Sequence, residues 1–238
     1  MEYTENDFKR SPYTGELLDI NYFRNRFKIR VGEPDRKIEA PKEVIEKYKD
    51  ILPEELLYYW EAYGFSSFND GLLWFTNPDD YEELIDEYLK GTQFENRKDL
   101  YIIARSAFGR VFVWESKKGN TFILFSLLNM ITFHADTDRK NLNLKEENIE
   151  INKQMSFSPQ YLDEEDANDK PLFERCLKKF GKLEADEMYG YKLSHFLGGA
   201  ESIKNIEKVN IFNHYSIQKQ LKEPHLVISD IENNTLMY

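Results

Sequence analysis

Four consecutive segments between residues 100 and 135 alternate with a period of two, and this alternation limits the chain to folds that contain an antiparallel sheet. The segments are LYIIAR, GRVFVWE, TFILFSLL and NMITFHA. Alternation sends successive side chains to opposite faces of a strand, and the short polar breaks between the segments suit reversals. In GRVFVWE, Val111 and Val113 share one face, and Phe112 and Trp114 share the other. Because both faces carry apolar groups, we expect the sheet to be covered on each side.

Helical patterns lie on both sides of this meander. PKEVIEKYKDIL at 41–52 predicts one helix, and EELLYYWEAY predicts the next, with Trp60 in the core and Gly64 ending it. NPDDYEELIDEYLKG predicts a helix capped by Asn77, and further helices are expected after Pro171 and over VNIFNHYSIQKQL. HLVISDI in the tail suits one more strand. The pattern predicts an α+β fold, an antiparallel β-meander packed with helices at both ends, as a single compact body or two closely joined lobes.

Three segments show no regular hydrophobic period. Residues 1–35 are polar with scattered aromatic residues and give no clear period. We expect residues 136–152 to form a charged connector, and EADEMYGYKLSHFLGGAES to be rich in turns.

The charge balance restricts the partners that the chain can have. Its 238 residues include 32 basic and 43 acidic side chains, a net charge of −11. Such a chain lacks the excess of cations that binding a nucleic-acid backbone requires, so we expect no direct contact with nucleic acid and favour a basic partner.

The N-terminus has no secretory signal pattern, and the longest apolar stretch, at 122–133, is too short to cross a bilayer. A cytoplasmic protein without membrane contact is therefore expected.

No motif in the sequence indicates catalysis. Glycine-rich phosphate loops, G-x-S-x-G and H-E-x-x-H are absent, and Cys176, the single cysteine, falls on an inward helical stripe. HADTD places His134, Asp136 and Asp138 at alternate positions that could hold a divalent cation. A strand that ends in a charged loop is the favoured interpretation of this segment, so we predict no metal, no cofactor and no enzymatic activity.

Two segments resemble known families. Residues 43–81, with Leu-Pro-x-x-Leu, Trp, Tyr-Gly-Phe, Gly-Leu-Leu-Trp and Asn-Pro, resemble the GAD-like domain. Residues 173–221, with Phe-Gly-x-Leu, Tyr-Gly-Tyr, Leu-Gly-Gly and a late His, are similar to the C-terminal domain of type VI secretion immunity proteins. The resemblance implies a GAD-like domain over 1–150 and an immunity-type helical domain with a tail over 151–238.

The function that this resemblance implies is immunity. Such proteins bind and neutralise a cognate toxin delivered between bacteria, and relatives with both domains accompany nuclease toxins, often DNases. The negative charge of this chain is complementary to the basic substrate cleft of a nuclease. The expected mechanism is occlusion of that cleft, with no chemistry by this protein.

The residues expected to contact the partner are those that the helical stripe and the turn leave exposed. They are Tyr58, the turn residues Ser66, Ser67, Asn69 and Asp70, and the acidic helix face formed by Asp79, Glu82, Glu83 and Asp86.

Two alternatives stay open at this point. The first is a stand-alone regulatory or small-ligand-binding module with an apolar pocket between two lobes. The second is a metal-dependent hydrolase that uses His134, Asp136 and Asp138.

Overall fold

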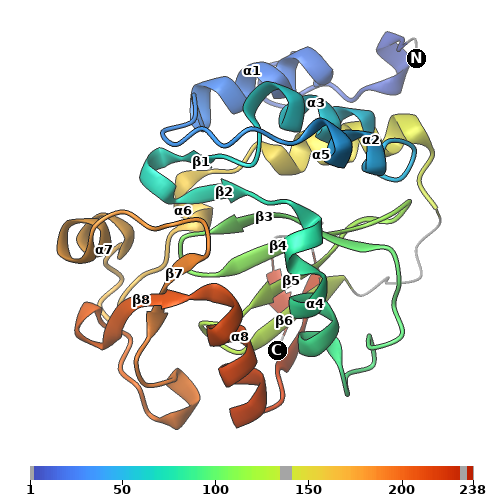
Figure 1. The fold of residues 1–238 in the computed structure, drawn as a ribbon. Helices are drawn as coiled ribbons and strands as arrows, with labels where there is room; N and C mark the ends of the chain where they lie inside the picture. Colours follow the sequence, from blue (N-terminus) through green and yellow to red (C-terminus); the bar gives the residue numbers. More distant parts are fainter. Residues whose placement is uncertain (1–2, 135–140, 231–234, 238) are drawn as a thin grey trace.

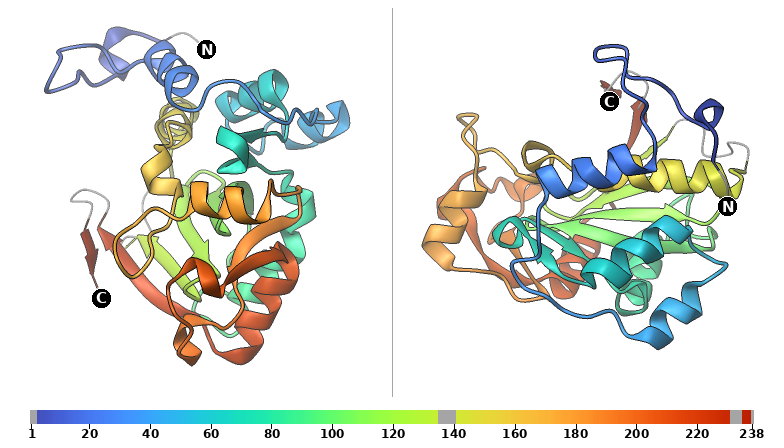
Figure 2. Two further views of the ribbon diagram at one scale, coloured as in Figure 1. Left: turned by 90° about the vertical axis from the view of Figure 1, so that its left-hand side faces the viewer. Right: turned by 90° about the horizontal axis from the view of Figure 1, so that it is seen from above.

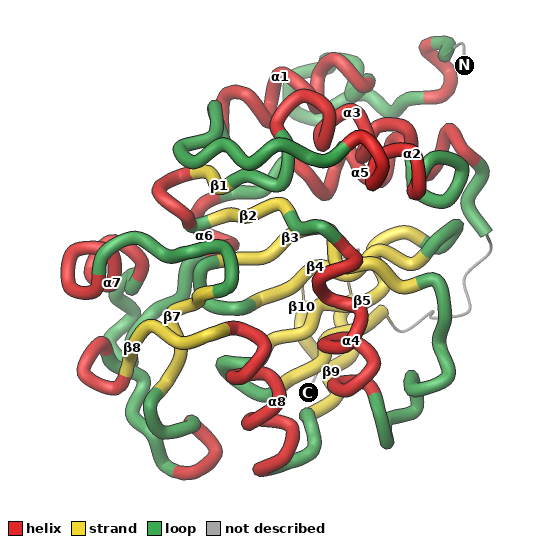
Figure 3. The backbone as a smooth tube through the Cα atoms, in the orientation of Figure 1, coloured by secondary structure: helices red, strands yellow, loops and turns green. Residues whose placement is uncertain are grey.

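A single mixed sheet runs through the middle of the molecule, with helices on the outside (Figure 1; Figure 3). The computed structural model describes residues 3–134, 141–230 and 235–237. Eight described strands form the sheet in the order β1-β2-β3-β4-β5-β6-β9-β10, and two more strands form a small ribbon. The strands of the main sheet are β1 (Ser67–Phe68), β2 (Leu73–Phe75), β3 (Leu100–Ser106), β4 (Arg110–Glu115), β5 (Gly119–Phe125), β6 (Met130–His134), β9 (His225–Asp230) and β10 (Thr235–Met237).

The predicted meander is confirmed. Strands β3 to β6 pair with their sequence neighbours in antiparallel fashion, with Val111 opposite Leu124 and Phe122 opposite Phe133. The tail strand β9 then joins β6 in parallel, with Ile131 opposite Leu226. The fold is therefore α+β, as the sequence predicts.

Each face of the sheet is covered by helices, as the apolar residues on both faces of β4 require. Phe112 and Trp114 belong to the larger core, under α1 (Ile20–Arg30), α2 (Lys42–Tyr48), α3 (Glu54–Tyr63) and α5 (Leu144–Met155). Val111 and Val113 belong to the smaller core, under α4 (Glu82–Leu89) and α8 (Ile211–Leu221). Figure 2 shows the layer of α1, α3 and α5 from two further sides.

The two segments that resemble known families share the larger core. It extends from Phe27 in α1 to Ile206 in β8 (Ile206–Asn210) and includes Phe173 and Cys176 of α7 (Phe173–Phe180). Cys176 is fully buried, as its inward position predicts. Helix α5 continues across residue 150, where the sequence places the boundary between the domains.

The aromatic residues of 58–75 are mostly core. Trp60, Tyr59 and Tyr63 are buried in α3, which ends at Gly64 as expected. Gly64 has φ of +70°, and a Cβ there would lie 1.9 Å from the carbonyl oxygen of Ile38, so no other residue fits. Phe27 lies at the centre of this cluster, with ring centroids of Tyr59, Tyr63 and Phe68 within 5.6 Å.

The expectation that 136–152 is a connector is wrong, because α5 begins at Leu144 within it. Asn143 caps this helix by accepting hydrogen bonds from the backbone of Lys145 and Glu146. Its inward face carries Glu147, Asn148 and Asn152 beside two apolar residues, so it shows no apolar stripe. These buried polar groups are hydrogen-bonded, which makes their burial possible.

Two other unpredicted elements follow from tertiary contacts. Helix α1 lies within residues 1–35, where no period is evident, and only Phe23 and Phe27 of its residues are buried. The segment expected to be rich in turns contains β7 (Glu187–Tyr191), which pairs with β8 (Ile206–Asn210). The first predicted helix is also shorter than expected, since α2 ends at Tyr48.

The remaining elements are short. They are the 3-10 helices at Glu5–Asp7, Asn69–Gly71, Pro78–Tyr81, His195–Leu197 and Ile203–Asn205, and the one-turn helix α6 (Pro159–Leu162). No helix in the described ranges is both long and apolar enough to cross a membrane.

The contact between α5 and α3 is testable through Asn152, which is fully buried. Its Nδ2 donates to Glu55 Oε2 (3.1 Å), and its Oδ1 accepts from the Tyr59 hydroxyl (3.0 Å). Asn152→Ala leaves the buried Tyr59 hydroxyl without a partner and removes one hydrogen bond from Glu55, which Arg24 still binds. We therefore expect a loss of about 1–3 kcal/mol in the free energy of unfolding, measured by urea denaturation. The control is Asn25→Ala on the exposed face of α1, expected within about 0.5 kcal/mol of the parent. Equal stability of both variants would contradict a structural role for this amide.

Candidate functional site: an acidic groove between two helices

A surface groove of about 370 Å³ lies between α4 and α8. We call it the acidic groove. It is lined by Asp79, Asp80, Glu82, Glu83, Leu84, Glu87 and Tyr88 from the α4 side, and by Phe212, Tyr215 and Ser216 from α8. Carboxylates form one wall, and aromatic rings form much of the other.

Local sequence fixes the position of α4. Asn77 accepts a hydrogen bond from the backbone of Asp79, Pro78 opens the preceding turn, and Glu82 and Glu83 occupy the first turn of the helix. Negative side chains there interact favourably with the positive end of the helix dipole. The apolar side of the helix, with Leu84, Ile85 and Tyr88, is buried against the sheet.

Helix α8 is held against the same face by Tyr215. Its hydroxyl lies 2.7 Å from the carbonyl oxygen of Gly109 and 2.8 Å from that of Leu124. Its ring meets that of Tyr88 edge to face, with centroids 4.8 Å apart. This pair of tyrosines joins α8 to α4 and forms the floor of the acidic groove.

Negative charge in the groove is only partly compensated. Residues 79–87 contain six carboxylates and no basic residue. Asp80, Glu82, Glu83, Asp86 and Glu87 are exposed, and none of them has an ion pair among the described residues. The spacing of Glu82 and Asp86, and of Glu83 and Glu87, places like charges one helical turn apart, which destabilises a helix slightly.

Asp79 is the exception, because it is bound inside the protein. Its carboxylate accepts hydrogen bonds from Lys47 Nζ and from the Tyr48 hydroxyl. Partial burial acts to raise the pKa of Asp79, but these two hydrogen bonds outweigh it and lower the pKa below its usual value. Asp79 therefore fixes α2 to the start of α4.

The structure does not bring all of the predicted contact residues together. Tyr58 lies on α3, on the other face of the sheet from α4, and the Arg24 guanidinium stacks 3.5 Å from its ring centroid. Asp70 lies before β2, at the opposite end of that strand from Asp79, and it pairs with Lys182 at 2.7 Å. Asn69 and Asp70 have positive φ (52° and 58°), as the turn prediction allows.

The expectation that Ser66 and Ser67 are exposed is wrong. Their exposed fractions are 0% and 1%. Ser66 Oγ accepts a hydrogen bond from the backbone of Ile38, and Ser67 donates to Asp35, because the segment 35–38 crosses β1. Of the predicted residues, Asp79, Glu82 and Glu83 line the groove, and Asp86 lies further along α4.

Residues that the sequence prediction missed complete the groove. Asp80 and Glu87 belong to the same acidic run and could have been included on that basis. Phe212, Tyr215 and Ser216 could not, because they lie more than a hundred residues away in the sequence. Ser216 Oγ donates to Glu87 Oε1 at 2.8 Å and orients that carboxylate.

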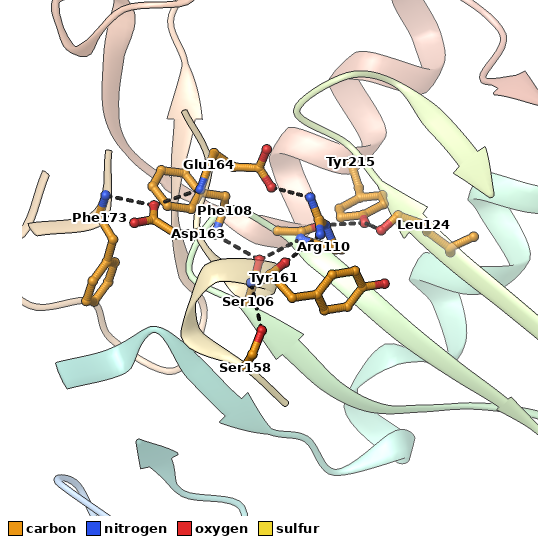
Figure 4. A network of polar contacts seen from close by, with 11 residues as sticks. Ser106, Phe108, Arg110, Leu124, Ser158, Tyr161, Asp163, Glu164, Phe173 and Tyr215 are labelled. Carbon is orange, nitrogen blue, oxygen red and sulfur yellow. Dashed lines mark hydrogen bonds and ion pairs between the residues drawn. The ribbon is translucent and has the colours of Figure 1, made fainter. Parts of the chain in front are cut away.

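A polar network centred on Arg110 attaches the C-terminal segments to the sheet (Figure 4). The Arg110 guanidinium donates to the Tyr161 carbonyl (2.6 Å) and to Glu164 Oε1 (2.5 Å), and it stacks on the Tyr161 ring. Asp163 in turn accepts a hydrogen bond from the backbone of Phe173 at the start of α7 (2.9 Å). The network therefore links β4, α6 and α7.

The proposed cation ligands Asp136 and Asp138 lie outside the described residues, as does the side chain of His134. Among the side chains that the structure does describe, no group of three His, Cys, Asp or Glu could hold a metal ion.

The structure is that of an α+β protein with an acidic groove on its surface, and comparisons with known proteins give the families. Residues 23–128 match the GAD-like domain, and residues 152–222 match the C-terminal domain of T6SS immunity protein Tdi1. The chain therefore carries a GAD-like domain followed by a domain of the Tdi1 family of type VI secretion immunity proteins.

A solved structure shares the fold. The crystal structure of Atu4351 from Agrobacterium tumefaciens superposes with a TM-score of 0.76, covers 90% of this chain and 96% of that chain, and is 22% identical in sequence. No curated protein matches the chain.

Glu164 makes the stability of the network dependent on pH. Burial, which outweighs the attraction of Arg110, raises its pKa from 4.5 to about 7. The folded state thus holds the proton more tightly than the unfolded chain. The contribution of the protonated Glu164 carboxyl to the free energy of unfolding is complete below about pH 4.5. This contribution is lost as the pH rises to about 7.

We therefore expect Glu164→Gln to reduce the decline in unfolding free energy between pH 5 and pH 8 by about 1–3 kcal/mol relative to the parent, measured by urea denaturation at both pH values. Exposed Glu61→Gln is the matched control and should leave the decline unchanged. An unchanged decline in Glu164→Gln would show that this carboxyl does not titrate in the range assigned to it.

Proposed function

We propose that this chain is an immunity protein that neutralises a toxic effector of a type VI secretion system by covering a basic surface of that effector. The observation that supports this proposal best is the acidic groove, whose exposed carboxylates have no cation partner in the described structure. The match of residues 152–222 to an immunity domain supplies the class of partner.

Electrostatics favour a basic partner at this surface. A cationic side chain that enters the groove meets several carboxylates and the aromatic rings of Tyr88 and Phe212, which can also stabilise a cation. Attraction between the net charge of −11 and a basic effector speeds their encounter and is weakened by salt. A bound cation also reduces the repulsion between the carboxylates along α4, which makes binding more favourable.

The kind of effector that fits the acidic groove best is a nuclease. Among nucleases, we expect a DNase. A nuclease presents a basic cleft to the phosphate backbone, and an acidic helix face can occupy that cleft without any chemistry. We propose that the two proteins meet in the cytoplasm, where occlusion of the cleft protects the chromosome.

A direct test combines growth and nuclease assays. The effector encoded beside this chain is expressed in a sensitive bacterium with and without the chain, and the purified effector is incubated with plasmid DNA. Restored growth together with protected DNA supports the proposal. If growth is restored but the effector attacks a different target, such as a lipid or the cell wall, the immunity function stands and the assignment of the effector as a nuclease is wrong. Unrelieved toxicity would overturn the proposed function.

Neutralising the groove should weaken binding without unfolding the protein. For Glu82→Gln combined with Glu83→Gln, we expect at least a tenfold increase in the Kd for the catalytically inactivated effector at low salt, because two exposed carboxylates are lost. The dependence of Kd on salt should also become shallower. Titration calorimetry at two salt concentrations measures both.

The control for that pair is Glu61→Gln, which removes an exposed glutamate from α3 on the far face of the sheet. It should bind as the parent does. If the double variant also binds like the parent at both salt concentrations, the effector contacts another surface.

A further inference from the structure

We propose that a second groove, on the other side of α8, receives an apolar side chain of the same effector, so that α8 is the central ridge of the interface. This inference rests on the proposed function and adds the second half of the contact surface. The groove has a volume of about 360 Å³, and we call it the apolar groove. Its aliphatic rim consists of Leu193, Leu197, Ile217 and Leu221.

These four side chains are unusually exposed for their type. Their exposed fractions are 47%, 52%, 52% and 52%. Single exposed aliphatic residues are common on soluble proteins, but a cluster around one hollow is typical of a binding surface. Val209 and Tyr191 of the β7–β8 ribbon extend the apolar lining below the rim.

The segment that carries Leu193 and Leu197 is held in a defined conformation. Asn205 Oδ1 accepts from the backbone of Leu193 (3.1 Å), and Asn205 Nδ2 donates to the carbonyl of Leu193 (2.9 Å) and to that of Ala200 (3.0 Å). A Cβ at Gly199 would lie 1.9 Å from the Leu193 carbonyl oxygen, so glycine is required there. Such pre-organisation lowers the entropic cost of binding.

Hydrogen bonds also connect this segment to α8. Ser194 Oγ donates to Gln218 Oε1 (2.7 Å). On α8 itself, His214 Nδ1 lies 3.1 Å from Ser126 Oγ in the turn between β5 and β6. Burial lowers the pKa of His214 to about 4, so the imidazole is neutral at physiological pH. The floor formed by Ser194, His214 and Gln218 is therefore neutral and internally bonded, and the charged lining residues, Lys192 and Glu207, are exposed. A neutral floor below an aliphatic rim suits an apolar occupant.

The two grooves share one helix. Phe212 and Ser216 face the acidic groove, and Asn213 and Ile217, each one residue further along, line the apolar groove. A partner that covers α8 thus meets carboxylates on one side and aliphatic groups on the other. An aliphatic or aromatic anchor flanked by Lys or Arg fits this arrangement, and such a buried anchor slows dissociation.

The negative charge of the chain favours a basic effector, rather than a second copy of this chain, as the partner that covers α8. A dimer formed through α8 would bring two acidic grooves close together on chains that each carry a net charge of −11. The resulting repulsion opposes self-association, whereas a basic partner gains from the same field.

The test compares one substitution at two exposed isoleucines on helices. Ile217→Gln lies in the apolar groove, and Ile29→Gln, at a position 84% exposed on α1, is the matched control. Both leave the net charge unchanged. For Ile217→Gln we expect at least a tenfold higher Kd for the inactivated effector, caused by faster dissociation, with an unchanged dependence on salt. Leu197→Ser in the rigid segment should behave in the same way, and Ile29→Gln should bind within twofold of the parent.

The outcomes separate this inference from the proposed function. Binding by Ile217→Gln and Leu197→Ser within twofold of the parent, while the parent binds tightly, would overturn the apolar groove and leave immunity in place. Failure of the parent itself to bind would overturn both. If the parent forms a dimer that Ile217→Gln abolishes, with effector affinity unchanged, the groove serves self-association and the inference is wrong.

Discussion

The docking of α8 onto the sheet through Tyr215 is the interaction on which the candidate site depends. The phenol hydroxyl lies within hydrogen-bond distance of the carbonyl oxygens of Gly109 and Leu124, and the ring packs against Tyr88 of α4. Together with the Ser216–Glu87 hydrogen bond, this contact sets the distance between α8 and α4, and α8 is the wall that both grooves share. His214, one residue earlier, makes a parallel attachment to Ser126 on the neighbouring turn. A short stretch of one helix therefore aligns both proposed halves of the interface.

Stability and the proposed binding place opposite requirements on α4, and the two faces of the helix meet them separately. The inward face, with Leu84, Ile85 and Tyr88, contributes to the smaller core. The outward face concentrates like charges that a purely structural helix would disperse. Burial on one side supplies enough stability to tolerate that repulsion. The carboxylates of the outward face therefore keep their uncompensated negative charge at a fixed position, as the proposed interface requires.

Two arginines, one buried and one partly buried, hold the C-terminal segments against the N-terminal ones. Arg105 of β3 is fully buried, donates to the carbonyl of Ala185 (2.9 Å) and lies over the Trp74 ring. Arg110 of β4 binds Tyr161 and Glu164. Together with the shared core, these contacts make residues 152–222 part of the same body as the sheet, so α8 has a rigid support.

The sequence predicts those parts of the molecule in which apolar residues follow a regular period. Strands β3 to β6 and helices α3, α4, α7 and α8 fall into this group. It does not predict α5, because buried amides of Asn148 and Asn152 replace the expected apolar stripe, nor β7 and β8, whose pairing depends on residues far apart in the chain. The acidic side of the candidate site is evident from residues 79–87 alone. Its second wall, and the burial of Ser66 and Ser67 beneath the segment 35–38, depend on tertiary contacts that no local pattern encodes.

Amide hydrogen exchange of this protein, with and without the inactivated effector, tests the central claim most directly. Exchange reports local opening along the whole backbone and requires no substitution. We expect binding to slow exchange in α4, in α8 and in the segment from Leu193 to Gly199. Protection confined to α1, α3 or the turn at Asn69 and Asp70, with α4 and α8 unchanged, would contradict the assignment of the effector to the grooves beside α8.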